Sequence, residues 1–219
     1  MSVALAIFVK TPGLSPLKTR LAASIGSECA ERFHQLAAAA TAEVVATLQP
    51  RITAYWAVAE ANGVDHPCWQ QFPTIWQGSA GLGARLDHVC AQLQARHGAV
   101  VLIGADAPQI TSELLSAALR ALEDDAAEFA LGRANDGGFW LFGTRVPVPA
   151  AVWQSVCYSQ PHTADDLLAA LAPFGAVATL PTLTDVDVAD DLPLLAAALA
   201  SIPDLSPTQC TLRDWLQAR

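Results

Sequence analysis

Short apolar runs alternate with helical stretches along the chain, and this alternation constrains the fold more than any other feature of the sequence. The runs have the length of strands, and the central one, AVVLIGA, is apolar enough to be buried on both faces of a sheet. Strands are predicted at 3–9, 52–59 and 99–105, and helices at 28–48, 82–98 and 111–122. This order predicts an α/β fold with a mainly parallel central sheet flanked by helices.

The second half of the chain continues the pattern after one expected hairpin. The segments 128–134 and 138–143 flank turn residues and are predicted to pair as antiparallel strands. A helix is predicted at 164–172, with Thr163 and Asp166 as a capping box at its start. A strand at 176–180, a helix opened by DVDVADD and a last helix containing TLRDWLQA complete the pattern.

No repeat, linker or low-complexity segment divides the 219 residues, and 53% of them are hydrophobic. We therefore expect residues 1–219 to form a single packed domain. In a mainly parallel sheet, ligands bind beyond the carboxyl ends of the strands. The loops that follow residues 9, 104 and 181 are therefore the places where a site is expected.

Charge is distributed unevenly along the chain. The net charge of -9 argues against a nucleic-acid or anionic-membrane partner, because either would require a broad basic surface. The first 27 residues are the exception, since they carry Lys10, Lys18 and Arg20 and no acidic residue. Both lysines of the chain lie in this segment. A small basic patch in an acidic protein predicts a small anionic ligand.

The basic patch lies in a loop, KTPGLSPLKTRL, that does not match the common phosphate-binding motifs. A P-loop requires glycine immediately before its lysine and again five residues earlier, where this chain has Leu17 and Pro12. No G-x-G-x-x-G follows the first strand, which excludes a dinucleotide fingerprint. Lysine point charges beside an arginine fork suit a di- or triphosphate, and a solvated surface loop is the alternative.

Acidic residues follow two of the predicted strands. Asp106 comes directly after the buried strand, where its carboxylate could hold Mg²⁺ or Mn²⁺ beside substrate phosphates or could accept backbone bonds in a turn. Asp185 and Asp187 lie two apart, so they face the same way on an extended chain. Asp187 is also a natural N-cap for the next helix, and a metal ligand and a cap are compatible roles.

Two glycine-containing segments are candidates for ligand contact. NDGG places Asp136, Gly137 and Gly138 in a turn, where the glycines would let a ligand approach the backbone closely. The same residues are also typical of an ordinary hairpin turn. QGSAGLGARL puts glycines before a helix with Arg85 near its first turn, as in an anion-binding loop or a flexible connection.

Cysteine usage and the first residues predict the compartment. The five cysteines are odd in number, widely spaced and never C-x-x-C, as in a reduced cytoplasmic protein. The run VALAIFV lacks the basic flank and cleavage site of a signal peptide, and no apolar run reaches the length of a membrane span. We therefore expect a cytoplasmic protein with no membrane contact.

Taken in order, the motifs resemble one bacterial family. F-x-K-x-P-x(5)-K-T-R-L, G-x-D-x-P, D-G-G-[aromatic] and D-V-D-x-x-[DE]-D-L are similar to the pattern of the radical-SAM/selenodomain-associated transferases. The match runs from Phe8 to Leu192. These small proteins belong to the GT-A nucleotide-diphospho-sugar transferase superfamily. The resemblance implies a GT-A, Rossmann-like fold, Mg²⁺ or Mn²⁺, a nucleotide or nucleotide-sugar donor and a small-molecule acceptor.

The resemblance also implies roles for individual residues. The phosphate-binding candidates are Lys10, Lys18, Thr19, Arg20 and Arg85. The metal candidates are Asp106 and Asp187, and the segment from Asp136 to Gly138 would border the donor or acceptor pocket. Lys18 and Asp106 are the candidate catalytic residues. The chain departs from the family pattern at Phe139, where the usual tyrosine would carry a hydroxyl.

Three functions are compatible with these motifs. In glycosyl transfer from a nucleotide sugar, the metal and the basic residues would neutralise the departing diphosphate. In nucleotidyl transfer, a phosphorylated acceptor would attack the α-phosphorus of a nucleoside triphosphate, and pyrophosphate would leave. The third possibility is a nucleotide-binding module without catalysis.

Overall fold

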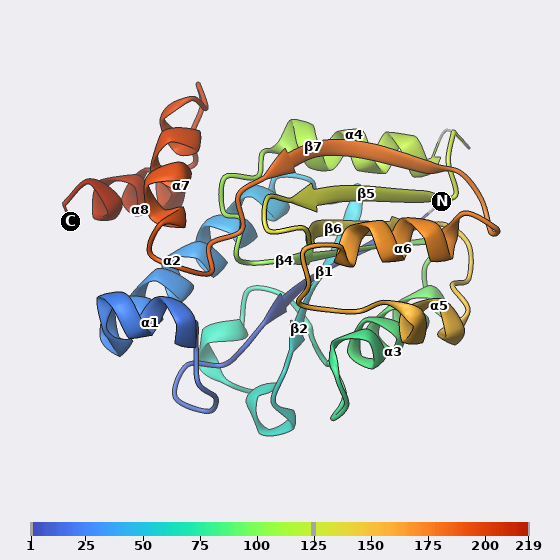
Figure 1. Ribbon diagram of the computed structural model, residues 1–219, viewed down its shortest axis with the longest axis horizontal. Helices are drawn as coiled ribbons and strands as arrows, with labels where there is room; N and C mark the ends of the chain where they lie inside the picture. Colours follow the sequence, from blue (N-terminus) through green and yellow to red (C-terminus); the bar gives the residue numbers. More distant parts are fainter. Residues whose placement is uncertain (1, 124–125, 219) are drawn as a thin grey trace.

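The computed structural model describes residues 2–123 and 126–218, and the strands in these ranges form one seven-stranded sheet (Figure 1). Its order is β3-β2-β1-β4-β6-β5-β7. The strands are β1 (Val3–Val9), β2 (Ile52–Val58), β3 (Thr74–Trp76), β4 (Ala99–Gly104), β5 (Phe129–Ala134), β6 (Phe139–Thr144) and β7 (Val177–Leu183). The helices are α1 (Thr19–Ile25), α2 (Ser27–Ala46), α3 (Leu82–Gln94), α4 (Ser112–Glu123), α5 (Ala150–Ser155), α6 (Thr163–Leu171), α7 (Asp191–Ala200) and α8 (Pro207–Gln217), with short 3₁₀ turns at Ala61–Gly63 and Pro67–Trp69.

The sheet is mixed rather than purely parallel. The neighbouring pairs β3–β2, β2–β1, β1–β4 and β5–β7 are parallel, whereas β6 runs antiparallel to both β4 and β5. The predicted hairpin is confirmed, because β5 and β6 pair across a short turn. The predicted α/β class is likewise confirmed, with one antiparallel strand that joins the edge pair β5–β7 to the parallel part of the sheet.

Helices cover both faces of the sheet, which explains why its central strands are apolar throughout. On β1, Leu5 and Ile7 pack in the cluster that includes α2 and α4, whereas Ala4 and Ala6 pack in the cluster that includes α3, α5 and α6. All four side chains are fully buried. Replacing a fully buried leucine such as Leu5 by alanine typically costs about 2–5 kcal/mol. The positions of the strands are therefore strongly fixed.

A second layer of helices lies beside one end of the sheet, where α1, α7 and α8 pack around α2 (Figure 1). Phe33 of α2 is fully buried in this cluster with Leu21 of α1 and Leu212 of α8. The Gln209 amide of α8 donates to the carbonyl oxygens of Pro108 and Ile110, at 2.9 Å each. The C-terminal helices are thereby attached to the loop that follows β4.

Two predicted helix boundaries are wrong. The helix predicted to run to residue 98 ends at Gln94. The predicted capping box at Thr163 is absent, because Thr163 is already the first residue of α6 and its hydroxyl lies 2.8 Å from the carbonyl oxygens of Cys157 and Gln160. The Asp166 carboxylate instead accepts a bond from the Cys157 N–H at 3.2 Å. Both side chains therefore stabilise the preceding loop.

The order of the strands locates a crevice at the carboxyl ends of β1 and β4. These two strands are neighbours, yet β1 continues to β2 on one side and β4 continues to β6 on the other. In α/β sheets, ligands bind where the strand order changes direction in this way. Lys10 follows β1 and Asp106 follows β4, so both lie at this point. Throughout 2–123 and 126–218, every helix falls short of the combined length and apolarity that a bilayer crossing requires.

Candidate functional site

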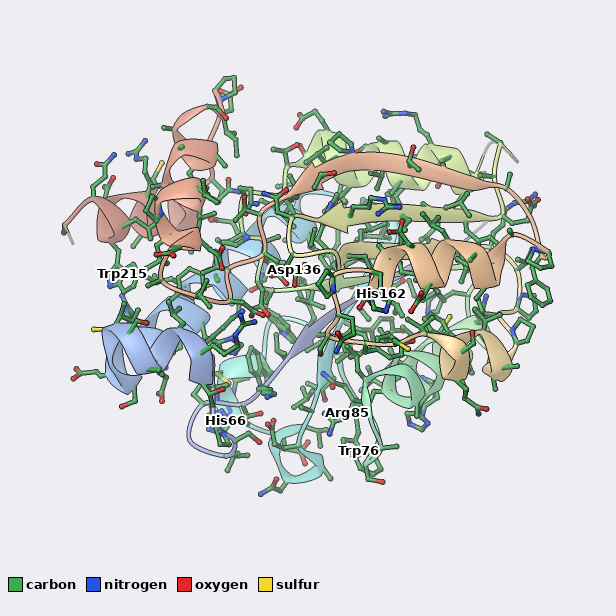
Figure 2. The ribbon with its side chains drawn as sticks, in the orientation of Figure 1. His66, Trp76, Arg85, Asp136, His162 and Trp215 are labelled. Carbon is green, nitrogen blue, oxygen red and sulfur yellow. The ribbon has the colours of Figure 1, made fainter. Side chains whose placement is uncertain are left out.

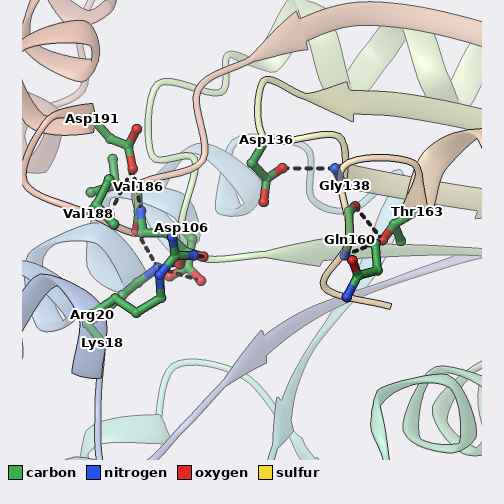
Figure 3. Close-up of polar contacts among 11 residues, drawn as sticks. Lys18, Arg20, Asp106, Asp136, Gly138, Gln160, Thr163, Val186, Val188 and Asp191 are labelled. Carbon is green, nitrogen blue, oxygen red and sulfur yellow. Dashed lines mark hydrogen bonds and ion pairs between the residues drawn. The ribbon is translucent and has the colours of Figure 1, made fainter. Parts of the chain in front are cut away.

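The ammonium group of Lys18 lies among three oxygen atoms from two segments of the chain, one after β4 and one before α7 (Figure 3). Its Nζ is 2.8 Å from Asp106 Oδ2, 3.2 Å from Asp187 Oδ1 and 2.5 Å from the carbonyl oxygen of Val186. The side chain is only 6% exposed. Lys18 occupies the N-cap position of α1 with left-handed dihedral angles, φ 43° and ψ 49°, which few non-glycine residues adopt.

The electrostatics of Lys18 are set by the carboxylates around it. Burial alone would lower the pKa of Lys18, but Asp106 and the two later aspartates raise it above its ordinary value. Lys18 is therefore firmly protonated. Arg20 adds a second positive charge at the rim, where its Nη1 lies 3.4 Å from Asp187 Oδ2.

Asp106, Asp185 and Asp187 form the acidic half of the site. Each offers a carboxylate oxygen, and these three oxygens lie within 4.8 Å of one another. Burial and the neighbouring Asp106 carboxylate raise the pKa of Asp185 above its ordinary value, against the opposing effect of Lys18. A third negative charge is thus disfavoured in the cluster unless a cation compensates it, and hard oxygen ligands of this kind match Mg²⁺ or Mn²⁺.

The sequence suggested that Asp187 is the N-cap residue of the following helix. The structure shows that it is not. Helix α7 begins at Asp191, and the residue at its N-cap is Asp190, whose side chain makes no capping bond. The Asp191 carboxylate instead accepts the N–H groups of Asp187 and Val188, at 2.8 Å each. The segment before α7 therefore folds back on the helix, which leaves the Asp187 carboxylate directed to Lys18 and Arg20.

A pocket of about 640 Å³ opens on one side of these aspartates and is called the basic pocket below. Its lining includes the cationic residues Lys10, Lys18, Arg20 and Arg85, with Thr19, Asp106 and Asp187. The start of α3, at Gly81 and Leu82, also lines it, and no side chain caps that helix. A free helix N-terminus and four cations create a strongly anion-attracting environment.

Gln77 is a residue of this pocket that the sequence analysis missed. Its buried amide donates to the carbonyl oxygens of Val9 and Ala57, at 3.2 and 2.7 Å, and so joins the ends of β1 and β2. Its Oε1 accepts from Arg85 Nη1 at 3.3 Å, while Arg85 Nε donates to the Ala80 carbonyl at 2.7 Å. The side chain of Arg85, a residue in the first turn of α3, is thereby held at the pocket wall (Figure 2). The available signal in the sequence was the position of Gln77 as the first residue of the glycine-containing segment QGSAGLGARL.

A second pocket, of about 630 Å³, lies on the other side of the aspartates and is called the aromatic pocket below. The two pockets share Asp106 and Asp187, together with Phe8, Arg20, Leu82 and Ser159. The aromatic pocket is further lined by Phe139, Trp140 and Tyr158, by Asp136, Gly138 and Asp185, and by the loop residues Gln160, Pro161 and Thr163. The two cavities therefore meet at the acidic cluster.

The β5–β6 turn holds Asp136 at the edge of the aromatic pocket (Figures 2 and 3). Asp136 Oδ1 accepts the Gly138 N–H at 2.9 Å. Gly137 has φ 90°, and a Cβ there would lie 1.9 Å from the Pro161 carbonyl oxygen. Its own carbonyl accepts the Ala164 N–H at 2.9 Å. Glycine is therefore required for the turn to pack against the loop before α6.

The structure brings the sequence-derived candidates together around two adjoining pockets. All five phosphate-binding candidates line the basic pocket. Among the turn residues, Asp136 and Gly138 line the aromatic pocket, and Gly137 lies between them in the chain. Asp106 and Asp187 border both cavities. Cys157, His162 and Asp166, which no sequence motif connects, also place donor atoms within 4.8 Å of one another in the neighbouring loop and α6.

A family model matches residues 32–160, more than half of the chain, and its description is "Uncharacterized protein conserved in bacteria (DUF2064)". The chain belongs to the DUF2064 family. The matched region of this DUF2064 chain includes Asp106 and Asp136 but ends before Asp185 and Asp187. None of the curated proteins matches the chain.

Solved structures resemble the DUF2064 chain over most of its length. A candidate nucleotide-diphospho-sugar transferase from Desulfovibrio desulfuricans G20 is 25% identical, with a TM-score of 0.85 over 99% of this chain and 97% of that one. A 4-diphosphocytidyl-2C-methyl-D-erythritol synthase from Anaerococcus prevotii DSM 20548 is 11% identical, with a TM-score of 0.60 over 91% and 96%. Rv0371c from Mycobacterium tuberculosis H37Rv, in complex with manganese, is 16% identical, with a TM-score of 0.51 over 92% and 100%. The fold of the chain is thus shared with nucleotide-using transferases.

Proposed function

We propose that this protein is a metal-dependent transferase that uses a nucleotide-activated donor, and that it transfers a glycosyl group from a nucleotide sugar. One observation carries the proposal: a cation-lined pocket and an aromatic pocket meet at Asp106 and Asp187. A diphosphate in the first pocket would then present its leaving bond at the acidic cluster, and the second pocket would receive the acceptor on the other side of that cluster. The similarity in fold to a candidate nucleotide-diphospho-sugar transferase supports this reading.

Cations supplied by the chain would bind the diphosphate. Lys10, Arg20 and Arg85 line the basic pocket from three different segments, and Arg20 and Arg85 can offer bidentate forks to phosphate oxygens. Lys18 has an oxygen partner for each of its three N–H donors, so it reaches a phosphate only by exchanging one of them. The N-terminus of α3 would add unpaired N–H groups.

Asp106, Asp187 and Asp185 are the residues that would hold Mg²⁺ or Mn²⁺. Their clustered oxygens fit a hard divalent cation, and the similarly folded Rv0371c is known in complex with manganese. When bound, such an ion supplies charge neutralisation for a departing diphosphate. Lys18 keeps its ammonium beside the same carboxylates, and thereby limits their mutual repulsion.

Nucleotidyl transfer is the second candidate. It is favoured by the similarity in fold to a 4-diphosphocytidyl-2C-methyl-D-erythritol synthase. At 11% sequence identity, this match shows a shared fold and nothing more. In this reaction the basic pocket would hold a nucleoside triphosphate, and an acceptor phosphate would attack its α-phosphorus. A place among the radical-SAM/selenodomain-associated transferases and a cytoplasmic location remain predictions from the sequence.

The proposal can be tested by thermal unfolding with nucleoside di- and triphosphates and nucleotide sugars, each with Mn²⁺ and with EDTA. A ligand that binds only the folded state raises the unfolding temperature. We expect a metal-dependent increase with at least one nucleotide sugar, and release of its nucleoside diphosphate when an acceptor is added. Release of pyrophosphate from a nucleoside triphosphate would favour nucleotidyl transfer. Nucleotide binding without turnover would favour a nucleotide-binding module without catalysis.

Matched variants connect the result to the site. Asp187→Asn should abolish the metal-dependent increase, whereas Asp190→Asn, an exposed carboxylate three residues away, should leave it unchanged. Arg85→Gln should weaken nucleotide binding, whereas Arg96→Gln, which lies outside both pockets, should not. If no nucleotide or nucleotide sugar stabilises the wild-type protein, either with Mn²⁺ or with EDTA, the proposed function is wrong.

A further inference from the structure

The aromatic pocket has the opposite charge pattern to the basic pocket. Among its described lining residues, Arg20 is the only cationic side chain, and its guanidinium already lies 3.4 Å from Asp187 Oδ2. Four carboxylates line the same cavity, from Asp106, Asp136, Asp185 and Asp187. A divalent cation on Asp106, Asp185 and Asp187 would offset their charge, but Asp136 lies outside that set and would still repel a phosphate monoester, which costs binding free energy.

Apolar groups form much of the remaining lining of the aromatic pocket, beside the polar residues Ser159, Gln160 and Thr163. The polar ends of two rings are engaged by the protein, because Trp140 Nε1 donates to the Pro181 carbonyl at 3.0 Å and the Tyr158 hydroxyl donates to the Trp153 carbonyl at 3.1 Å. The parts of these side chains that line the cavity are therefore their apolar surfaces. Together with Phe139, Leu86 and Leu102, they suit a compact ligand with an apolar face.

Asp136 combines a fixed position with an available oxygen. Its Oδ1 is held by the Gly138 N–H, whereas Oδ2 accepts no hydrogen bond from residues 2–123 or 126–218 (Figure 3). The turn that carries it is fixed on both sides by the Gly137 contacts with Pro161 and Ala164. A positioned carboxylate with a free oxygen can accept a hydrogen bond, and then a proton, from a hydroxyl.

We propose that the aromatic pocket binds a non-phosphorylated acceptor, a compact alcohol with an apolar face, and that Asp136 binds its reacting hydroxyl. This inference rests on the proposed glycosyl transfer. The acceptor oxygen forms a bond to the anomeric carbon of the nucleotide sugar, and the bond from that carbon to the diphosphate oxygen breaks. The electron pair of the broken bond leaves on the diphosphate, and the hydroxyl proton passes to Asp136.

The test compares alcohols with their own phosphate monoesters. Each compound is added to wild-type protein with Mn²⁺ and a saturating nucleotide sugar. The pairs are glucose and glucose 6-phosphate, glycerol and glycerol 3-phosphate, and 2-phenylethanol and its phosphate. Affinity from thermal shifts and product from mass spectrometry are recorded for every pair. We expect at least one alcohol to be preferred over its monoester by about tenfold or more. A preference for a monoester in any pair, or no preference in all pairs, overturns the inference.

Two substitutions test the stated cause. Gln160→Arg adds a cation to the pocket lining and should reduce the preference for the alcohol about tenfold, whereas Gln160→Glu should retain it. Asp136→Asn should leave the nucleotide-dependent thermal shift unchanged but lower the transfer rate, or lower the affinity for the alcohol where no product forms. The control is Asp65→Asn, which changes an exposed residue outside both pockets and should behave as wild type. Wild-type behaviour of Asp136→Asn contradicts the role of Asp136.

The two proposals fail in different ways. If the wild-type protein shows no nucleotide-dependent thermal shift at all, the proposed function itself is wrong. If that shift is present and the sugar is transferred, but monoesters are the better acceptors, only the inference about the aromatic pocket is wrong.

Discussion

Lys18 is the residue on which the geometry of the site depends most directly. Its ammonium group lies between Asp106 and Asp187, which belong to segments that are far apart in the sequence. Without it, the three neighbouring carboxylates would keep only the exposed Arg20 guanidinium, 3.4 Å from Asp187, as a nearby counter-charge. Removing one partner of a buried ion pair typically costs about 3–5 kcal/mol, because the remaining charge is uncompensated.

Lys18→Met should lower the free energy of unfolding in EDTA by a smaller amount, about 1–3 kcal/mol, because Asp106 and Asp187 are 36% and 39% exposed and solvent screens part of their charge. Mn²⁺ should restore part of this loss, because the ion supplies the missing positive charge to the carboxylates. Urea unfolding with and without Mn²⁺ measures both effects. Lys10→Met is the matched control, since Lys10 is exposed and should change the free energy by less than about 0.5 kcal/mol. Equal stability of the two variants in EDTA would contradict the account of Lys18.

His34 predicts a dependence of stability on pH. Burial lowers the pKa of His34, against the opposing effect of Asp106, and its Nε2 lies 2.9 Å from the Lys10 carbonyl oxygen. As the pH falls through 6.5, the ordinary pKa, the unfolded chain therefore takes up a proton that the folded chain does not. This contribution to stability is complete above pH 6.5 and is lost as the pH falls toward the lower pKa of the folded state.

His34→Gln keeps a possible N–H donor for the Lys10 carbonyl but removes the titration. Between about pH 7.5 and 5.5, wild-type protein should lose more free energy of unfolding than this variant. Urea unfolding at several pH values measures the two slopes. Parallel slopes would show that His34 titrates alike in the folded and unfolded chains.

At the scale of elements, the β5–β6 turn depends on Gly137. Both Gly137 and Gly13 have positive φ, at 90° and 79°, but a Cβ would clash with Pro161 at Gly137 and would meet nothing within 4 Å at Gly13. Gly13→Ala should cost about 1–2 kcal/mol, from backbone conformation alone. Gly137→Ala should cost about 1–3 kcal/mol more, from displacement of the loop. Thermal unfolding of the two variants measures the difference, and equal costs would exclude the clash.

The elements also show what sequence patterns can and cannot predict. The strands β1, β2 and β4 were predicted to within a residue, because apolar runs of their length must be buried. The short elements α1, β3 and α5 were missed, since their few residues carry no clear period and are defined by packing against other parts of the chain.

The positions of the candidate site residues were predicted to a similar extent. Lys10 and Asp106 were expected at the same edge of the sheet because each follows a recognisable strand, and the carboxyl ends of neighbouring parallel strands meet. The contact of Lys18 with Asp187 was not foreseen, because it depends on where α1 begins and on how Asp191 folds the segment before α7. The wall of the aromatic pocket was missed because it is an irregular loop in which Ser159 has a φ of 59°.

At the scale of the whole molecule, a third of the basic residues gather at one pocket, 4 of 12. The chain has 12 basic and 21 acidic residues, and the basic pocket alone takes Lys10, Lys18, Arg20 and Arg85. A ligand that fits inside this pocket meets local attraction, whereas a long polyanion must also lie along a surface with a net charge of -9. The size of an anion should therefore determine whether it binds.

A nucleoside diphosphate should bind this protein and duplex DNA should not, although both present phosphate groups. In low salt with Mn²⁺, we expect the diphosphate to raise the unfolding temperature. A duplex of about 20 base pairs, added at equal phosphate concentration, should not raise the unfolding temperature and should not displace the diphosphate. Raising the ionic strength to about 0.3 M should weaken diphosphate binding, because the pocket is open to solvent and its charges are screened. Displacement of the diphosphate by the duplex would show that the basic surface extends well beyond the pocket and that the acidic remainder of the molecule does not repel polyanions.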